Sequence, residues 1–180
     1  MNKVYEKGHS NFFNIYEKKI YEKKINGKFL IIGSGSGIVP IFFYKKIFKK
    51  IKYPKVILLD PIIKNVGYGS PFDEYGFIYK LSKLNLKYQR IIFLTMTSSQ
   101  GFKIFYRSDF KFEIVYIDGN HSLKFVLEDL LKYSKIAKTL ILHDYNLVGV
   151  KNAVKTFLKK KKIKRFKEYS QSPGLCVIDL

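Results

Sequence analysis

The sequence predicts a doubly wound α/β fold whose mostly parallel sheet ends in an antiparallel hairpin. Short apolar runs alternate with amphipathic helical patterns along much of the chain, as they do in parallel sheets. Glycines cluster after the first run, and three later runs end abruptly in an aspartate. Two strand-like runs with only turn residues between them close the chain, which is the pattern of a hairpin.

Length and composition predict one globular domain spanning residues 1–180, because the chain is 47% hydrophobic and 27% charged. The apolar runs are shorter than the roughly 20 residues of a membrane-spanning helix, and the first residues lack the apolar core of a secretion signal. We therefore expect a cytoplasmic protein that does not enter a membrane. The single cysteine, Cys176, excludes an internal disulfide and a thiolate metal cluster, and we expect it in a buried strand.

The formal net charge of +20 makes nucleic acid a candidate partner. The 34 basic residues, however, include arginine only at Arg90, Arg107 and Arg165, and arginine is preferred for bidentate contacts to phosphates and bases. The abundance of Lys, Ile, Phe, Tyr and Asn is also typical of an AT-rich coding sequence. Nucleic acid stays open as a partner and is the less favoured one.

The first predicted strand, KFLII, ends at Ile32 and runs into Gly33, Gly35 and Gly37. Glycines at this spacing let the backbone approach a ligand closely, and the N-terminus of the helix expected behind them offers N–H groups to it. The alternative is a tight turn that packs a strand against a helix. The glycines therefore form a candidate binding loop.

A second apolar run, Lys55 to Leu59, ends at Asp60. An acid about 20 residues beyond such glycines, at the tip of the second strand, is typical of ribose binding. The alternative is a turn residue before Pro61. Asp60 is our candidate for holding a ribose.

Three other stretches carry weaker signals. Residues 9 to about 25 predict an amphipathic helix that ends at Asn26-Gly27, and residues 64–88 predict a long loop followed by a short helix. Arg90 to Met96 predicts a third strand. The polar residues at its end, Thr97 to Gln100 with Ser98 among them, either meet an adenine or form a solvated loop.

Two further runs end in aspartates. Phe112 to Ile117 runs into Asp118, and Thr139 to Leu142 runs into His143 and Asp144. Because the carboxyl ends of parallel strands lie at one edge of a sheet, the two carboxylates are expected to converge on one crevice.

Helical patterns follow both aspartates. Ser122 is placed to cap the first of these helices. The apolar positions of that helix are Leu123, Val126, Leu127, Leu130 and Leu131. The second has the apolar stripe Val150, Ala153, Val154, Phe157 and Leu158 and ends in Lys159 to Lys162. The runs Ile163 to Tyr169 and Leu175 to Leu180 then predict the terminal hairpin.

These motifs resemble those of class I S-adenosylmethionine-dependent methyltransferases. FLIIGSGSG resembles the cofactor loop of that family, although Ile31 stands where its members usually carry an acid, and Asp60 matches the ribose-binding acid. Small-molecule O-methyltransferases of the sugar and macrolide type are similar to a second segment, VYIDGNHSLKFVLEDLLKYSKIAKTLILHDYNLVGVKNAVKTF. They often carry a second aspartate at the position of His143. The resemblance implies a Rossmann-like sheet of seven strands with a terminal hairpin.

The resemblance also implies a cofactor and a set of site residues. S-adenosyl-L-methionine would be the methyl donor and a small-molecule hydroxyl the acceptor. The residues expected to bind the cofactor are Gly33, Ser34, Gly35, Gly37, Asp60, Ser98 and Asp118. The candidate catalytic residues are Asp118, His121, His143 and Asp144.

Metal dependence is a separate question. In metal-dependent relatives, acids at the ends of strands four and five hold Mg²⁺, and Asp118 and Asp144 match those positions. Tyr145 or Asn146 stands where relatives often place a third ligand. If there is no metal, His121 or His143 is the expected general base, because imidazole titrates near neutral pH.

Two alternatives use the same fold. A nucleic-acid methyltransferase is favoured by the charge, but the amino-methylating enzymes carry an Asn/Asp-Pro-Pro-aromatic tetrad after strand four, where this chain has Asp-Gly-Asn-His. A non-catalytic protein that keeps the fold is favoured by Ile31, and the two strand-end aspartates argue against it. The oligomeric state stays open.

Overall fold

The computed structural model describes residues 27–33, 55–61, 91–170 and 174–180 of the chain. The helix predicted over residues 9–25, the loop predicted over 64–88, and Ser34, Gly35 and Gly37 lie outside the described residues.

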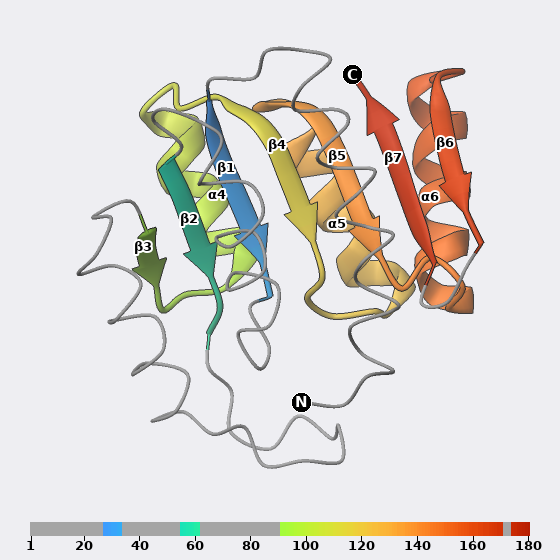
Figure 1. The fold of residues 1–180 in the computed structure, drawn as a ribbon, viewed down its shortest axis with the longest axis horizontal. Coiled ribbons are helices and arrows are strands. Elements are labelled where there is room, and N and C mark those ends of the chain that lie inside the picture. Colours follow the sequence, from blue (N-terminus) through green and yellow to red (C-terminus); the bar gives the residue numbers. More distant parts are fainter. Residues whose placement is uncertain (1–26, 34–54, 62–90, 171–173) are drawn as a thin grey trace.

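The sheet has seven strands in the order β3-β2-β1-β4-β5-β7-β6, and the first five of these are parallel (Figure 1). β7 pairs antiparallel with β5, and β6 pairs antiparallel with β7. This confirms the predicted mostly parallel sheet with an antiparallel hairpin. The strands are β1 (Lys28–Ile32), β2 (Lys55–Leu59), β3 (Ile91–Leu94), β4 (Phe112–Ile117), β5 (Ala137–His143), β6 (Phe166–Tyr169) and β7 (Leu175–Asp179).

The described helices, α4 (Ser98–Arg107), α5 (Leu123–Tyr133) and α6 (Val148–Lys161), lie on one face of the sheet (Figure 1). Alternate strand residues such as Leu30 and Ile32 join the core beneath these helices. Ile31, which points to the other face because side chains alternate along a strand, is also fully buried. Both faces of the sheet centre are therefore covered, as a parallel sheet requires. No helix in the described part of the chain is long and apolar enough to cross a membrane.

Helix α4 was not predicted. The polar residues Thr97 to Gln100 form its N-cap and its first turn. Thr97 is its N-cap and accepts a hydrogen bond from the backbone of Gln100, whose side chain accepts one from the backbone of Thr97. This is a capping box. The residues after Leu94 therefore lead into a helix and do not form a solvated loop.

The helices that follow the two aspartates were predicted correctly, except for one cap. Ser122 occupies the N-cap position of α5, but its side chain makes no capping hydrogen bond. Instead, the backbone N–H of Ser122 donates a hydrogen bond to the side-chain oxygen of Asn120, just before the helix begins. The predicted apolar stripe of α6 is buried, and so is Cys176 in β7.

Asp129 gives this fold a pH dependence of its own. It is buried in α5, and burial, together with the charge of Glu128, raises its pKa to about 6. A hydrogen bond from Ser98 and the charge of Lys132 act in the opposite direction. The folded protein thus carries a carboxylate that is costly to ionise.

We predict that Asp129→Asn stabilises the protein at neutral pH. Because the folded-state pKa exceeds the unfolded value of 3.8, the free energy of unfolding falls as pH rises from about 4 to about 6. The loss amounts to at most about 3 kcal/mol, and the amide removes it while keeping an acceptor for Ser98. Urea unfolding across this pH range measures the effect.

The exposed Asp109 supplies the matched control, since Asp109→Asn should keep the wild-type dependence on pH. An Asp129→Asn protein with the same dependence as wild type would show that this carboxylate is not the cause.

Candidate functional site

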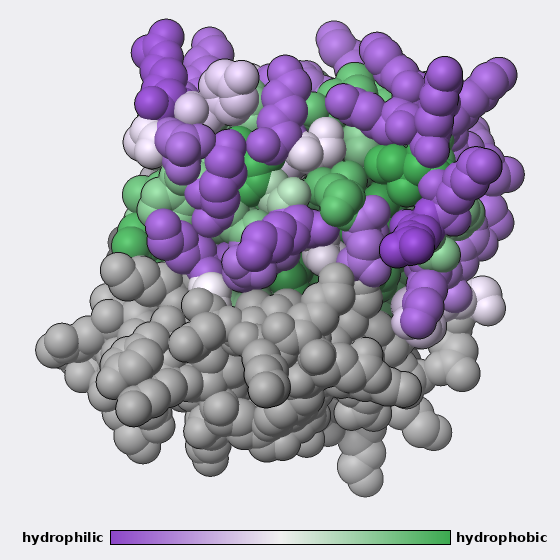
Figure 2. Space-filling view, turned by 90° about the horizontal axis from the view of Figure 1, so that it is seen from above, coloured by the Kyte–Doolittle hydropathy of each residue, from purple (hydrophilic) through white to green (hydrophobic). Residues whose placement is uncertain are grey.

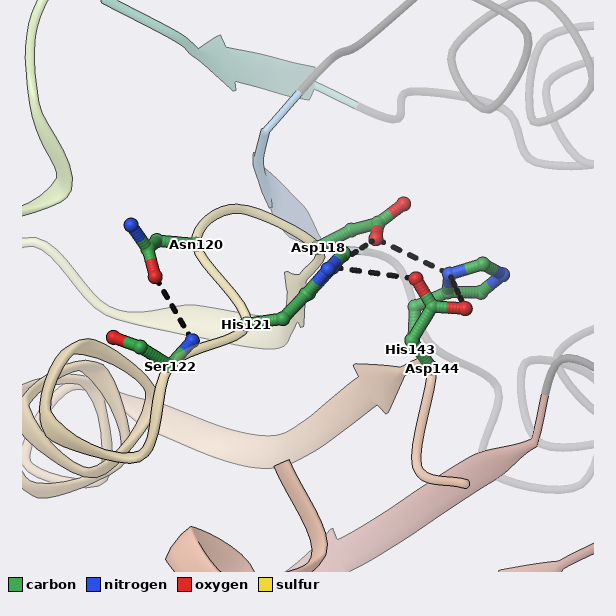
Figure 3. A network of polar contacts seen from close by, with 6 residues as sticks. All are labelled: Asp118, Asn120, His121, Ser122, His143 and Asp144. Carbon is green, nitrogen blue, oxygen red and sulfur yellow. Dashed lines mark hydrogen bonds and ion pairs between the residues drawn. The ribbon is translucent and has the colours of Figure 1, made fainter. Parts of the chain in front are cut away.

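Four titratable side chains meet where β4 and β5 end (Figure 3). Asp118 directly follows β4, His143 is the last residue of β5, Asp144 follows it, and His121 lies in the loop between β4 and α5. The register of the two strands explains the meeting, because Ile117 pairs with Leu142 and the next residues on each strand are Asp118 and His143. The predicted convergence of the two aspartates is confirmed, and both histidines join them.

Each imidazole contacts both carboxylates. His121 Nε2 lies 3.4 Å from Asp118 Oδ1 and 3.3 Å from Asp144 Oδ2. His143 Nδ1 lies 3.1 Å from Asp118 Oδ1 and 3.3 Å from Asp144 Oδ1. Carboxylates and imidazoles thus alternate around the cluster.

The mutual contacts shift the pKa values of the cluster. Burial alone would lower the pKa of His143, but hydrogen bonding and charge from Asp118 and Asp144 raise it to about 10. The hydrogen bond to Asp118 raises the pKa of His121. Burial of Asp118 would raise its pKa, yet its bonds to the two histidines lower it. In the metal-free protein the carboxylate of Asp118 is therefore ionised and His143 is protonated at neutral pH.

The backbone around Asp144 and His121 is shaped to hold these positions. Asp144 has φ +53°, in the left-handed region that non-glycine residues seldom adopt and that aspartate tolerates better than most. Gly149, near the start of α6, approaches the loop so closely that an added Cβ would lie 2.4 Å from the carbonyl oxygen of His121. The site is therefore held from the backbone as well as through its side chains.

The ends of β1 and β2 lie at the same edge (Figure 1). Gly33, with φ +82°, packs on the end of β4, and an added Cβ would lie 2.1 Å from the carbonyl oxygen of Asp118. Its N–H bonds Leu59 O at 2.9 Å, and the N–H of Asp118 bonds Ile32 O at 2.8 Å. Partly exposed Asp60 follows β2. Three predicted cofactor residues, Gly33, Asp60 and Asp118, therefore share this edge.

Ser98 lies at the first turn of α4 and contacts α5. Its carbonyl oxygen accepts a hydrogen bond of 2.7 Å from the hydroxyl of Tyr133, and its side chain bonds the buried Asp129. These contacts give Ser98 a structural role between two helices. Its predicted role at an adenine stays a prediction.

The residues after Asp144 turn to the hairpin. The hydroxyl of Tyr145 donates a hydrogen bond to Glu168, and the amide of Asn146 donates one of 3.1 Å to the carbonyl oxygen of Ser170.

The side-chain atoms that could together ligate a metal ion belong to Asp118, His143 and Asp144, all within 4.8 Å of one another. This set offers one nitrogen with two carboxylates, and Mg²⁺ prefers oxygen donors. The predicted Mg²⁺ site therefore fits these residues poorly.

No protein-family model and no curated protein sequence matches the chain, whereas solved structures match it along most of its length. The chain is similar to a TDP-rhamnose 3'-O-methyltransferase of calicheamicin biosynthesis, with a TM-score of 0.65 and 10% identity over 95% of this chain and 80% of that one. For the O-methyltransferase NovP the TM-score is 0.60 and the identity 13%, over 90% and 75% of the two chains. For an O-methyltransferase from Bacillus cereus in complex with SAH, the TM-score is 0.60 and the identity 12%, over 86% of this chain and 75% of that one. The chain has the class I methyltransferase fold, as its motifs predicted.

We predict that Gly33→Ala destabilises the protein and disturbs the site. The new methyl group would meet the carbonyl of Asp118, and alanine disfavours a positive φ, so we expect a loss of about 2–4 kcal/mol. Gly119→Ala is the control, because its Cβ would make an ordinary contact of 3.6 Å with Ile32. Denaturant unfolding compares the two, and equal stabilities would contradict the close approach of β1 to β4.

Proposed function

We propose that the protein is an S-adenosyl-L-methionine-dependent methyltransferase that acts on a hydroxyl of a small molecule of the sugar or natural-product type. One observation carries the proposal: two carboxylates and two imidazoles converge at the edge of a class I methyltransferase fold. The solved structures similar to the chain include O-methyltransferases, one of which acts on TDP-rhamnose. These similar enzymes support a hydroxyl as the acceptor.

The donor-binding residues of the proposal are Gly33, Asp60 and the loop that continues from Gly33. S-adenosyl-L-methionine supplies a methyl group on a sulfonium, which is already a good leaving group. Asp60, at the tip of β2, is the acid suited to the two ribose hydroxyls. Gly33 approaches Asp118 closely and donates a hydrogen bond to Leu59, the residue before Asp60, so the two donor-binding residues of the proposal lie at neighbouring strand tips.

The cluster supplies the acid–base chemistry. The acceptor oxygen attacks the methyl carbon in line with the breaking carbon–sulfur bond, and the hydroxyl proton must leave the oxygen. His143 is nearly buried, with 9% of its side chain exposed, whereas His121 is 18% exposed. We assign the base to His121, because it is the more exposed of the two imidazoles. Asp118 and Asp144 hold the His121 ring and stabilise the imidazolium formed when it accepts the proton.

A nucleic-acid substrate is the second candidate, and the net charge of +20 favours it. Figure 2 looks onto the edge of the sheet opposite the cluster, and hydrophilic side chains there are spread between apolar ones with no single stripe. This distribution does not favour a dedicated groove on that face. A gel shift that weakens steeply with added salt would favour nucleic acid as the substrate.

We predict micromolar binding of S-adenosylhomocysteine that is weakened about tenfold or more by Asp60→Ala, since two hydroxyl contacts to a carboxylate are lost. Isothermal titration measures this. Asp144→Asn serves as the control and should bind within a few-fold of wild type. Wild-type affinity in Asp60→Ala refutes the ribose assignment, and a wild-type protein that binds neither donor nor product refutes the enzyme proposal.

We predict that Asp118→Asn and Asp144→Asn each reduce kcat by about 100-fold or more while leaving donor affinity nearly unchanged. An amide lacks the charge that stabilises the imidazolium of His121, and base catalysis is worth about 10²–10⁴ in rate. Transfer of labelled methyl from the donor, with an acceptor found by screening small-molecule alcohols, gives kcat. Full turnover in both variants would remove the cluster from the chemistry.

A further inference from the structure

We propose that Asp118, His143 and Asp144 bind a divalent first-row transition metal ion in preference to Mg²⁺, with the imidazole of His143 as a ligand. This inference deepens the proposed function, on which it rests for its role in catalysis. Metal binding itself requires neither methyl donor nor acceptor, so it is measured independently.

The spacing of the donor atoms suits one shared ion. His143 Nδ1 lies 3.1 Å from Asp118 Oδ1 and 3.3 Å from Asp144 Oδ1, and the three residues have donor atoms within 4.8 Å of one another. Two ligands bonded at about 2.1 Å are about 3.0 Å apart in an octahedron and about 3.4 Å apart in a tetrahedron. Both observed separations fall in this interval.

The donor types select the class of ion. Imidazole is a good ligand for zinc, iron and nickel, whereas Mg²⁺ takes oxygen ligands almost exclusively. The oxygen and amide groups of Tyr145 and Asn146, which follow in the chain, are turned toward Glu168 and Ser170. The nitrogen of His143 is therefore the third donor that the fold brings to the two carboxylates.

His121 acts as a support behind the ligands. Its Nε2 contacts Asp144 at Oδ2, and the contact of Asp144 with His143 is through the other oxygen, Oδ1. The same Nε2 lies 3.4 Å from Asp118 Oδ1. Hydrogen bonds of this kind orient ligating carboxylates and contribute strongly to metal affinity. The unusual φ of Asp144 aims its carboxylate at this arrangement.

The charges of the cluster balance a divalent ion. Two carboxylates carry −2, and a coordinating imidazole is neutral. The chain as a whole carries +20, which disfavours weak binding of cations elsewhere on the surface and makes a saturable site easier to recognise.

Electron paramagnetic resonance of bound Mn²⁺ tests the ligand directly. We expect one Mn²⁺ per chain, and pulsed spectra that show coupling to the ¹⁴N of a directly bonded imidazole. Calorimetric competition should give Zn²⁺ a dissociation constant at least about tenfold below that of Mg²⁺.

Variants assign the nitrogen to its residue. In His143→Asp we expect the ¹⁴N coupling to disappear and the preference for Zn²⁺ over Mg²⁺ to fall at least about tenfold, because an oxygen donor replaces the nitrogen. The double variant His9→Gln/His121→Gln keeps His143 as the single histidine of the chain and should retain the coupling. This double variant assigns the ligand even if His143→Asp does not fold.

Three results would overturn the inference. They are the lack of saturable binding of Mn²⁺ and Zn²⁺, bound Mn²⁺ without nitrogen coupling in the wild-type protein, and bound Mn²⁺ without the coupling in the double variant. Failure of the proposed function is seen separately, as the lack of donor binding in a protein that still shows the nitrogen-coupled ion.

Discussion

The pairing of two carboxylates with two imidazoles is the interaction on which the site depends. Asp118 and Asp144 follow adjacent parallel strands, and two carboxylates brought to one crevice repel each other unless positive charge or hydrogen-bond donors separate them. His121 and His143 do this, each lying within 3.4 Å of an oxygen of both acids. The register of β4 and β5 sets Asp118 beside His143, so the spacing of these two side chains is fixed by strand pairing before any loop is considered.

Close backbone contacts complete the site. Gly33 meets the Asp118 carbonyl, Gly149 meets the carbonyl of His121, and Gly174, with φ +83°, meets the side chain of Asn146. The first contact joins the tips of β1 and β4, and the second joins the start of α6 to the loop before α5. These two contacts leave no room for a Cβ, so the fold tolerates little movement of the cluster relative to the sheet.

The sequence predicted the strands well because all of those described except β6 are short apolar runs bounded by polar or turn residues, whereas β6, with the sequence FKEY, was predicted as one strand of the terminal hairpin. It predicted the two aspartates at one edge because that follows from parallel pairing alone. It did not predict α4, although Thr97 and Gln100 have the spacing of a capping box, because the first turn of the helix, Ser98 to Gln100, is polar and was considered as a solvated loop. The ring of contacts among the four side chains could not be predicted either, since it depends on strand register and on the left-handed backbone of Asp144. The turn of Asn146 toward Ser170 likewise depends on the position of the hairpin.

In the proposed metal site, position 143 decides which ion is preferred more than the two aspartates do. The O-methyltransferases that the chain resembles often carry an aspartate there, and three carboxylates with a divalent ion would leave one negative charge. With histidine, two carboxylates and a divalent ion are neutral, and one hard oxygen donor becomes a nitrogen. Both changes act in the same direction, because lower negative charge weakens the hold on strongly hydrated Mg²⁺ while imidazole favours a softer ion. A neutral cluster also exerts little net attraction on a sulfonium, so binding of the methyl donor would rest on the strand tips at Gly33 and Asp60. Under the two proposals, one residue at the end of β5 would separate the part of the site that selects the ion from the part that holds the donor.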